Sequence, residues 1–568
     1  MKRSKRSQSK QKIAVKTKPS RPAASAIATR FKAAFVLHQE GRWDEAAARY
    51  RSLLRSQPQH FDSLRLLATI AAQRKDSASA IELFDQALRI RPDHASSLNH
   101  RGNALLDLKR HDEALASYDR ALQLEPDYAE AHFNRANALL EWEYHDRGSE
   151  QKALELYRSG YPSGDRKRHE QALQSYRHAL ELEPNYVEAW FNRGNALHEL
   201  NRPREALQSY DRAITLQPAH AAAHFNRGNV LIDLHRHRAA LRSYQRALEL
   251  KPDDAQFHLN RAFVWLLLGD FTRGWPENEW RWKRPNFPLP EFAHPRWTGE
   301  PLRDRTLLLH WEQGLGDTLQ FVRYAPLLQR QGARVIICCQ KPLVKLMKRC
   351  EGIDKVVADS EPLPVFDYWT PLMSLPTVMR TDHGSIPGEC GYITADPTLV
   401  IHWEKRLAKF PGYRIGIAWQ GSPDHQADRQ RSTPLRFFAA LARIPGVRLI
   451  SLQKGPGAAQ LADIAGSFEP VQFDDLDMKH GAFMDTAAIM RNVDLVVCCD
   501  SSLVHLAGAL GVPAWLPLKF APDWRWMLNR DDSPWYPSMR LFRQQALGEW
   551  GGVFERMARE IRRRLPGG

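Results

Sequence analysis

Small and aromatic residues recur at a fixed period along the first half of the chain. Successive prolines lie 34 residues apart, with one interval of 58, at Pro58, Pro92, Pro126, Pro184, Pro218 and Pro252. An Ala-x3-aromatic-x2-Ala pattern precedes five of them, at Ala80/Phe84/Ala87, Ala114/Tyr118/Ala121, Ala172/Tyr176/Ala179, Ala206/Tyr210/Ala213 and Ala240/Tyr244/Ala247. Spacings of four and three residues place these side chains on one helical face. The pattern predicts helical hairpins over residues 27–282, with an insertion near 142–166.

The helix before the last four of these patterns carries a small residue at one equivalent position, namely Gly102, Ala136, Gly194 or Gly228. A small side chain there lets two helices approach closely, and the proline ends each hairpin because it cannot continue helical hydrogen bonding. With all these positions in register, the region resembles the tetratricopeptide repeat. The resemblance implies an α-helical superhelix with a concave groove.

Asparagines form two further columns along these hairpins. The first column is Asn134, Asn192, Asn226 and Asn260, and the second is Asn103, Asn137, Asn195 and Asn229. Two interpretations are open. The amides can bond within the repeats, or they can bind the backbone of an extended peptide, because each amide is both donor and acceptor. The repeat arrays of protein O-GlcNAc transferases are known for such a ladder, so the resemblance implies a protein or peptide partner in the groove.

Continuous apolar runs replace this periodicity in the second half. They lie at 306–310, 334–339, 414–419, 448–452, 494–499 and 513–516. Buried parallel strands have this character, and intervening helices imply right-handed βαβ units. The irregular stretch 358–411 divides the runs, so we expect two Rossmann-like lobes, at 305–411 and 412–568, with a cleft between them. Five prolines in residues 283–304 predict a linker before the first lobe.

A glycine-rich motif, Gly314-Leu315-Gly316-Asp317, directly follows the run at 306–310. Its glycines permit a tight strand-to-helix turn, and the start of the helix favours negative charge. Asp317 can alternatively be an ordinary helix cap.

A second motif begins where another apolar run ends, with Asp500, Ser501 and Ser502, and continues to His505. Hydroxyls and free amides at a helix start suit a diphosphate, and a nearby histidine can add a hydrogen bond or a positive charge. Taken singly, the histidine is explained by packing and the serines by capping. Taken together, the set favours an anion site.

The glycine turn and the segment Asp500–Pro513 make residues 305–565 similar to heptosyltransferase-type glycosyltransferases of the GT-B fold. A repeat array joined to such a domain resembles the architecture of protein O-GlcNAc transferases, and the whole chain resembles bacterial tetratricopeptide-repeat glycosyltransferases. The resemblance implies a nucleotide-sugar donor bound between the lobes, without an obligatory metal. It makes Asp317 the general base. The donor-binding residues that it implies are Gly314, Gly316, Gln420, Ser422, Arg431, Lys454, Asp500, Ser501, Ser502 and His505.

This chain also departs from those families. Ser502 replaces a glycine that is common in heptosyltransferases, and the catalytic signature of O-GlcNAc transferases cannot be placed. The identities of donor and acceptor therefore stay open. The aromatic segment Asp523–Trp526 and the later Trp535 and Tyr536 are interpreted either as lining for a base or sugar pocket or as core packing.

Charge and cysteine content narrow the picture. The net charge is +16, but residues 1–21 carry nine basic residues and no acid, so we expect residues 1–26 to be a basic disordered tail. The remaining charge gives little support for a nucleic-acid partner. Six cysteines form no CxxC pair, as expected for reduced thiols in a cytoplasmic protein. We expect no secretory leader, no membrane span and no metal site, the DxD at Asp475 and Asp477 being attributed to chance.

Two functions from different classes follow from these patterns. The favoured one is a metal-independent glycosyltransferase whose repeats recruit the acceptor, with protein O-glycosylation as one form of it. The alternative is a non-catalytic scaffold in which the repeats bind partners and the α/β half has lost turnover.

Overall fold

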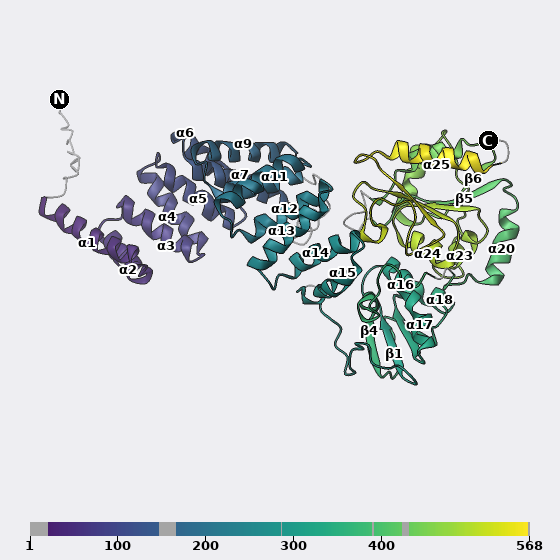
Figure 1. The fold of residues 1–568 in the computed structure, drawn as a ribbon. Helices are drawn as coiled ribbons and strands as arrows, with labels where there is room; N and C mark the ends of the chain where they lie inside the picture. Colours follow the sequence, from purple (N-terminus) through teal and green to yellow (C-terminus); the bar gives the residue numbers. More distant parts are fainter. Residues whose placement is uncertain (1–20, 147–165, 286, 389–390, 423–430, 566–568) are drawn as a thin grey trace, which may run out of the picture. The chain divides into compact units, whose positions relative to one another are not determined.

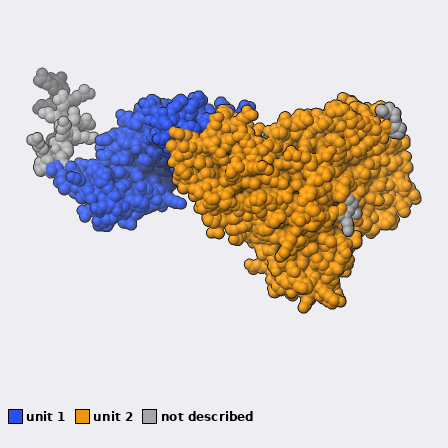
Figure 2. All heavy atoms as spheres, in the orientation of Figure 1, with its two compact units in different colours: residues 1–153, 162–200 blue, residues 154–161, 201–568 orange. Residues whose placement is uncertain are grey.

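The computed structural model describes residues 21–146, 166–285, 287–388, 391–422 and 431–565 (Figure 1). The chain divides into two compact units, residues 1–153 with 162–200 and residues 154–161 with 201–568 (Figure 2). Most of the expected basic tail and of the expected insertion lies outside the described residues. Helix α1 begins at Arg21, so the last six positions assigned to the tail are helical.

Helical hairpins build the first unit and the beginning of the second. The helices of the first unit are α1 (Arg21–Gln39), α2 (Trp43–Ser56), α3 (Phe61–Gln73), α4 (Ser77–Ile90), α5 (Ala95–Asp107), α6 (His111–Leu124), α7 (Ala129–Asp146), α9 (Arg166–Leu182) and α10 (Val187–Glu199). Those of the second are α11 (Pro203–Leu216), α12 (Ala221–Asp233), α13 (His237–Leu250), α14 (Ala255–Leu267) and α15 (Phe271–Asn278). The hairpin periodicity predicted from the sequence is therefore confirmed.

The small and the aromatic residue of a hairpin pack against each other, as predicted. A Cβ atom placed on Gly102 would lie only 2.5 Å from Cε1 of Tyr118, and Gly228 has the same relation to Tyr244. The tyrosine hydroxyls donate to second-column asparagines, over 2.7 Å from Tyr118 to Asn103 and over 2.7 Å from Tyr244 to Asn229. The second asparagine column thus joins the two helices of a hairpin.

An arginine clamp that we did not predict joins consecutive hairpins. Arg227 Nε donates to Asp211 Oδ1 at 2.6 Å, and its Nη1 donates to Ser243 Oγ at 2.7 Å. Arg135 makes the equivalent bonds to Asp119 and Ser175 in the first unit, at 2.6 and 2.8 Å. Each arginine therefore bridges the second helix of one repeat to the second helix of the next.

Two parallel sheets follow the hairpins. The first has the strand order β3-β2-β1-β4 and the second β6-β5-β7-β8-β9. The strands are β1 (Thr306–His310), β2 (Arg334–Cys339), β3 (Lys355–Ala358), β4 (Tyr368–Pro371), β5 (Tyr413–Ala418), β6 (Val447–Ser451), β7 (Leu495–Cys498), β8 (Ala514–Leu518) and β9 (Met539–Arg543). All six predicted strands form, whereas β3, β4 and β9 were missed.

The helices and turns of this region connect and cover the sheets. They are α16 (Leu315–Phe321), α17 (Ala325–Arg330), α18 (Val344–Met347), α19 (Leu375–Val378), α20 (Pro397–Leu407), α22 (Ala439–Ala442), α23 (Met484–Met490), α24 (Ser502–Leu510) and α25 (Trp550–Arg564). The 3₁₀ turns used below are η1 (Glu279–Lys283), η6 (Gly455–Ile464) and η7 (Trp524–Trp526).

The stretch 358–411 is not irregular, because it contains β4, α19 and α20. Helix α20 packs with the second lobe: Trp403 Nε1 donates to Asp485 at 2.7 Å, and Asn492 donates to the Val400 carbonyl at 2.9 Å. The packing thus assigns residues 397–407 to the second lobe, although the sequence placed them in the first.

The proline-rich segment 283–304 also packs against the first lobe rather than forming a free tether. The Trp297 N–H donates to the Trp369 carbonyl at 2.8 Å, and the ring of Phe292 lies edge-on to that of Trp369 at 4.8 Å. Trp297 is buried. An apolar segment of this kind is held by its side chains even though its prolines prevent regular structure.

The last repeats share one hydrophobic core with both lobes. Trp275 of α15 is buried, and its ring meets those of Phe321 and Trp524 edge-on at 6.2 and 5.1 Å. The hydroxyl of Thr377 donates to the Trp275 carbonyl at 3.1 Å. The end of the array is therefore part of the α/β unit, whereas the sequence placed a domain boundary at residue 282.

Candidate functional site

A cleft of about 1380 Å³ lies within the second unit. The glycine turn of the first lobe forms one wall and the start of α24, with neighbouring loops of the second lobe, forms another. The last repeats form a third, which includes Asp233, His237, Phe263 and Asn278. Pockets for drug-sized ligands typically have about 300–1,000 Å³. The cleft therefore has room for a nucleotide-sugar and part of an acceptor.

The two polar motifs, far apart in the sequence, meet in this cleft. A Cβ atom on Gly316 would lie 2.8 Å from Cδ2 of His505 and 3.6 Å from Cα of Ser502. Helix α16 can therefore approach α24 closely only because residue 316 has no side chain. Gly314, Gly316 and Asp317 line the cleft together with the second motif.

Asp317 has partners for both of its carboxylate oxygens. Oδ2 accepts the Gly314 N–H at 2.9 Å, so Asp317 caps α16 from its third position, with Gly314 as the N-cap, whereas the sequence suggested Asp317 as the N-cap itself. Oδ1 forms an ion pair with Arg525 of η7. The structure thus places Asp317 at the cleft, but as a cap and an ion-pair partner.

Asp500 lies deep in the cleft wall. Its Oδ2 accepts the indole N–H of Trp526 at 2.8 Å. Burial raises the pKa of Asp500, the negative charge of Asp523 raises it further, and the Trp526 bond and Arg431 oppose the shift. The side chain is therefore fixed by an aromatic ring that belongs to the segment singled out in the sequence.

Ser501 and Ser502 begin α24 and line the cleft. The Ser501 Oγ makes no capping bond, and among the residues that the structure describes it is buried without a hydrogen-bond partner. Capping therefore does not account for this serine. A buried hydroxyl without a partner is unusual in a native protein, and it leaves a donor and an acceptor ready for a ligand at the helix start.

His505 is buried one turn inside α24. Its Nδ1 lies 2.9 Å from the Tyr536 hydroxyl, and its ring stacks on Trp526 with centroids 5.6 Å apart. Burial lowers the pKa of His505 well below its usual value, and the charges of Arg525, Arg323 and Arg431 lower it further. The imidazole is therefore neutral at pH 7, so the positive charge considered for it in the sequence is not available.

The remaining donor-site candidates also line the cleft. Gln420 and Ser422 follow β5, and the Gln420 N–H donates to Gln453 Oε1 at 2.9 Å. Lys454 precedes η6, and its Nζ donates to the Leu476 carbonyl at 2.7 Å. Arg431 lines the cleft as well. The structure thus brings every donor-site residue predicted from the sequence to one cavity.

Several lining residues were missed. Arg525 carries the ion pair to Asp317, and its guanidinium also lies 4.3 Å above the ring centre of Trp524. Lys519 follows β8 and lines the cleft, where burial lowers its pKa. The sequence did hold one indication for Arg525, which lies between two tryptophans. A guanidinium in such apolar surroundings needs an acidic side chain as its ion-pair partner. The repeat residues Asp233 and His237 carried no signal of their own.

The aromatic segment serves mainly as core. Trp526, Trp535 and Tyr536 are buried, and among the tryptophans only Trp524 is part of the cleft lining in the described chain. Packing was one of the two interpretations drawn from the sequence.

The DxD pair has structural partners. Asp475 pairs with Arg406 at 2.7 Å, and Asp477 accepts the N–H groups of Asp485 and Thr486 at 2.7 and 3.1 Å at the start of α23. Within the described ranges there is no group of three or more His, Cys, Asp or Glu side chains that could hold a metal ion. Nor does any helix there have the length and apolar character that a membrane span requires.

The first-column asparagines make bonds to neighbouring repeats. Asn192 Nδ2 donates to Asn137 Oδ1 at 3.0 Å in the first unit, and Asn260 donates to Asn229 at 2.8 Å in the second. Asn134 donates to Asn99 at 3.1 Å, and Asn226 is buried. Amide bonds within the array, the first of the two interpretations, are therefore present in the structure. Binding of a peptide backbone by the same asparagines stays a prediction.

Family models of the tetratricopeptide repeat match much of the first half. Models described as "Tetratricopeptide repeat" match residues 36–95, 187–220 and 221–254, and one described as "TPR repeat" matches 102–141 and 165–201. The chain carries tetratricopeptide repeats. Protein FlbA of Caulobacter vibrioides is 28% identical over 329 residues, which are 53% of this chain and 54% of that protein. The match thus spans about half the length of this curated relative.

Solved structures of other proteins are similar to part of this chain. YrrB, described as a TPR protein with an unusual peptide-binding site, is 18% identical; the match covers 37% of this chain and 95% of that one, with a TM-score of 0.30. PilF of Pseudomonas aeruginosa is 18% identical over 42% of this chain and 97% of that one, with a TM-score of 0.34.

Proposed function

We propose that this tetratricopeptide-repeat protein is a glycosyltransferase with a GT-B fold, which transfers a sugar from a nucleotide-sugar to an acceptor recruited by the repeats. One observation carries the proposal. The glycine turn with Asp317, the general base that the resemblance implies, and the helix start with Ser501 and His505, which it assigns to the donor, line one cleft and come together at Gly316.

The donor diphosphate binds at the start of α24. Backbone N–H groups there are free of helical partners and favour an anion, and the Ser501 hydroxyl adds an unused donor. Arg431 and Lys454 line the same cleft and supply positive charge. Because His505 is neutral, its contribution is a hydrogen bond or a packing surface.

Transfer needs one proton acceptor and a stabilised leaving group. The acceptor hydroxyl oxygen bonds to the anomeric carbon, the bond from that carbon to the diphosphate oxygen breaks, and the nucleoside diphosphate leaves with the electron pair. Asp317 takes the hydroxyl proton, for which each carboxylate oxygen keeps a lone pair beyond its present contact. The cations of the second lobe stabilise the diphosphate, so we expect no metal requirement.

The repeats recruit the acceptor, for which we propose an extended peptide segment. Of the four first-column asparagines, Asn134, Asn192 and Asn260 have donor and acceptor positions beyond the bonds described above. The last repeats also contribute Asp233, His237 and Asn278 to the cleft wall. An acceptor bound along the final repeats can thus extend directly into the cleft.

The proposed setting is the cytoplasm. Cys338, Cys339, Cys350, Cys498 and Cys499 are buried free thiols, and Cys390 lies outside the described residues. Burial raises the pKa of Cys338 to about 11 and that of Cys339 to about 12, so both stay protonated at neutral pH. Buried, protonated thiols suit a reducing compartment.

A ligand screen tests the proposal directly. The full chain is heated with nucleoside diphosphates and with nucleotide-sugars at millimolar concentration, and sugar release from any stabilising donor is then measured. Stabilisation should follow mass action, about 2.7 kcal/mol at one hundred times the dissociation constant. If no compound shifts the melting temperature, the donor site is rejected. Binding without turnover, with any candidate acceptor, would favour the non-catalytic scaffold.

A further inference from the structure

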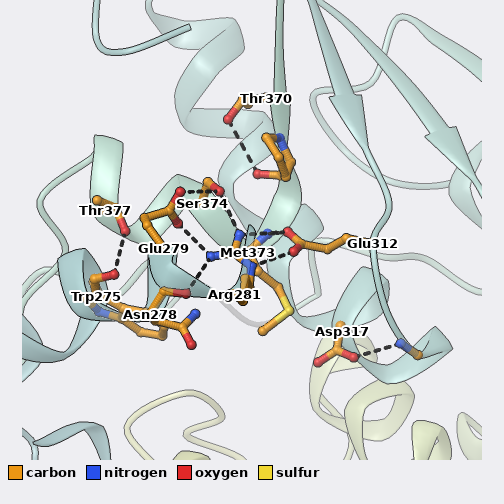
Figure 3. A network of polar contacts seen from close by, with 12 residues as sticks. Trp275, Asn278, Glu279, Arg281, Glu312, Asp317, Thr370, Met373, Ser374 and Thr377 are labelled. Carbon is orange, nitrogen blue, oxygen red and sulfur yellow. Dashed lines mark hydrogen bonds and ion pairs between the residues drawn. The ribbon is translucent and has the colours of Figure 1, made fainter. Parts of the chain in front are cut away.

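A buried ion pair joins the end of the repeats to the loop that carries the glycine turn (Figure 3). Arg281 lies in η1, and Glu312 lies two residues before Gly314. The guanidinium binds the carboxylate through two bonds, with Nε 2.7 Å from Oε2 and Nη2 3.2 Å from Oε1. The side chains are 3% and 2% exposed. When two charges are buried this deeply, removal of one leaves the other without compensation, which is strongly destabilising.

Arg281 is the main counter-charge of Glu312. Burial raises the pKa of Glu312, whereas Arg281 opposes the shift, as does the Met373 N–H, which donates to Oε1 at 2.8 Å. Arg281 also donates to the Asn278 carbonyl at 3.1 Å and to Ser374 Oγ at 2.7 Å, and it pairs with Glu279. The arginine is therefore fixed from several sides and can act as a rigid anchor.

Bonds at successive residues connect this anchor to Asp317. The carbonyl of Gln313 accepts the side-chain amide of Gln340 at 3.0 Å. The next residue, Gly314, donates its N–H to Asp317 Oδ2 at 2.9 Å. Gln313, Gly314, Asp317 and Met373 all line the cleft. A displacement of Glu312 would consequently move the cleft wall that carries Asp317.

We propose that Arg281 is a positioning residue of the candidate site: it holds Glu312, and through Glu312 the turn that carries Asp317, in place for transfer. This inference rests on the proposed function. It makes the final segment of the repeats part of the support for the acceptor side of the cleft. The donor-side groups Ser501, Arg431 and Lys454 lie on elements of the second lobe, so donor binding depends little on Arg281.

Steady-state kinetics of the full chain test this separation. Arg281→Met should lower kcat by about 10- to 100-fold, the loss expected when a reacting group is misplaced by about 1 Å. The KM for the nucleotide-sugar should change by less than about twofold, because the loss lies in the transition state rather than in donor binding. Arg281→Lys should recover part of kcat, because it keeps the charge but not the two-bond geometry.

Arg296→Met is the matched control. Arg296 belongs to the same network, where it donates to Ser374 Oγ at 2.8 Å and pairs with Glu279, and its side chain is 28% exposed. We expect kcat of this variant to stay within about twofold of wild type. An equal loss in the Arg296 variant, or wild-type kcat in a folded Arg281→Met protein, would overturn the inference.

Two further outcomes are separable. Should Arg281→Met fail to fold, Glu312→Gln carries the same expectation, because it keeps the size of the side chain and an acceptor for Met373. If the wild-type chain turns over no nucleotide-sugar, the proposed function fails first. If it does, and neither the Arg281 nor the Glu312 variant lowers kcat, the positioning role alone is rejected.

Discussion

Arg525 forms an ion pair with Asp317 and so links the two lobes across the cleft. The side chains are 12% and 17% exposed. Arg525 is itself held by Asp523 at 2.9 Å and by Gln320 at 2.6 Å. The carboxylate proposed as the base is therefore oriented by a residue from the second lobe.

Replacing the Asp317 carboxylate should separate its two roles. Asp317→Asn keeps an acceptor for the Gly314 N–H but cannot take a proton, so we expect turnover to fall by about 10²- to 10⁴-fold. The melting-temperature shift caused by a nucleoside diphosphate should stay near that of wild type.

Asp396→Asn is the control, because Asp396 likewise caps a helix, α20, and pairs with an arginine, Arg349, but is not among the residues that line the cleft in the described chain. It should keep most of the turnover. Near-normal transfer by Asp317→Asn would reduce Asp317 to a helix cap and an ion-pair partner.

Removing the Ser501 hydroxyl should weaken diphosphate binding without loss of stability. A hydrogen bond to a charged group contributes about 1.5–3 kcal/mol, so Ser501→Ala should raise the dissociation constant about 10- to 100-fold. The free protein should lose no bond, because the Oγ has no hydrogen-bond partner within the described ranges. Calorimetric titration with a nucleoside diphosphate measures the first effect and thermal unfolding the second.

Ser538→Ala provides the comparison. Its Oγ is also buried without a partner, but Ser538 is not among the residues that line the cleft in the described chain. The dissociation constant should not change. Equal affinity in the Ser501 and Ser538 variants would place the diphosphate elsewhere.

The depressed pKa of His505 predicts a pH dependence of stability. The unfolded chain binds a proton near the ordinary value of 6.5, whereas folded His505 stays neutral well below it. The free energy of unfolding should therefore fall as the pH drops below that value, with a limiting slope of about 1.4 kcal/mol per pH unit from this residue.

Comparison with His505→Gln isolates this contribution from those of other groups, such as Asp500, whose raised pKa acts in the opposite direction. Urea unfolding at several pH values between about 5 and 8 should show a shallower dependence for the variant. Parallel curves for the two proteins would mean that His505 titrates normally.

The first asparagine column should matter for a macromolecular acceptor. Replacing Asn134, Asn192, Asn226 and Asn260 with Ala removes four bonding groups, each worth about 0.5–1.5 kcal/mol. We expect weaker use of a peptide acceptor, while hydrolysis of the donor by water continues. Because three of these amides also bond within the array, a modest fall in melting temperature is expected.

The second column gives the contrast. Asn103, Asn137 and Asn229 accept tyrosine hydroxyls at 2.6–2.7 Å, so their replacement should lower the melting temperature more. Acceptor use at full efficiency by a folded first-column variant would show that recruitment lies elsewhere.

The sequence determined the elements whose pattern is local. The 34-residue period, the Gly102–Tyr118 contact and six of the strands follow from spacing and from runs of apolar residues. Two of the three missed strands, β3 and β4, have only four residues each, too few to give a distinct pattern. Most of the donor-site candidates lie in motifs that directly follow a predicted strand, whereas Arg431 was implied by the family resemblance.

The tertiary structure decided what depends on contacts between distant residues. Asp317 forms an ion pair in addition to its capping bond because Arg525, more than two hundred residues away in the sequence, lies next to it in the fold. The neutral state of His505 follows from burial and from three arginines on other segments. The union of the last repeats with the α/β region depends on Trp275 and on the Arg281–Glu312 pair, because burial of an aromatic ring or a charge is a property of the surrounding fold and not of local sequence.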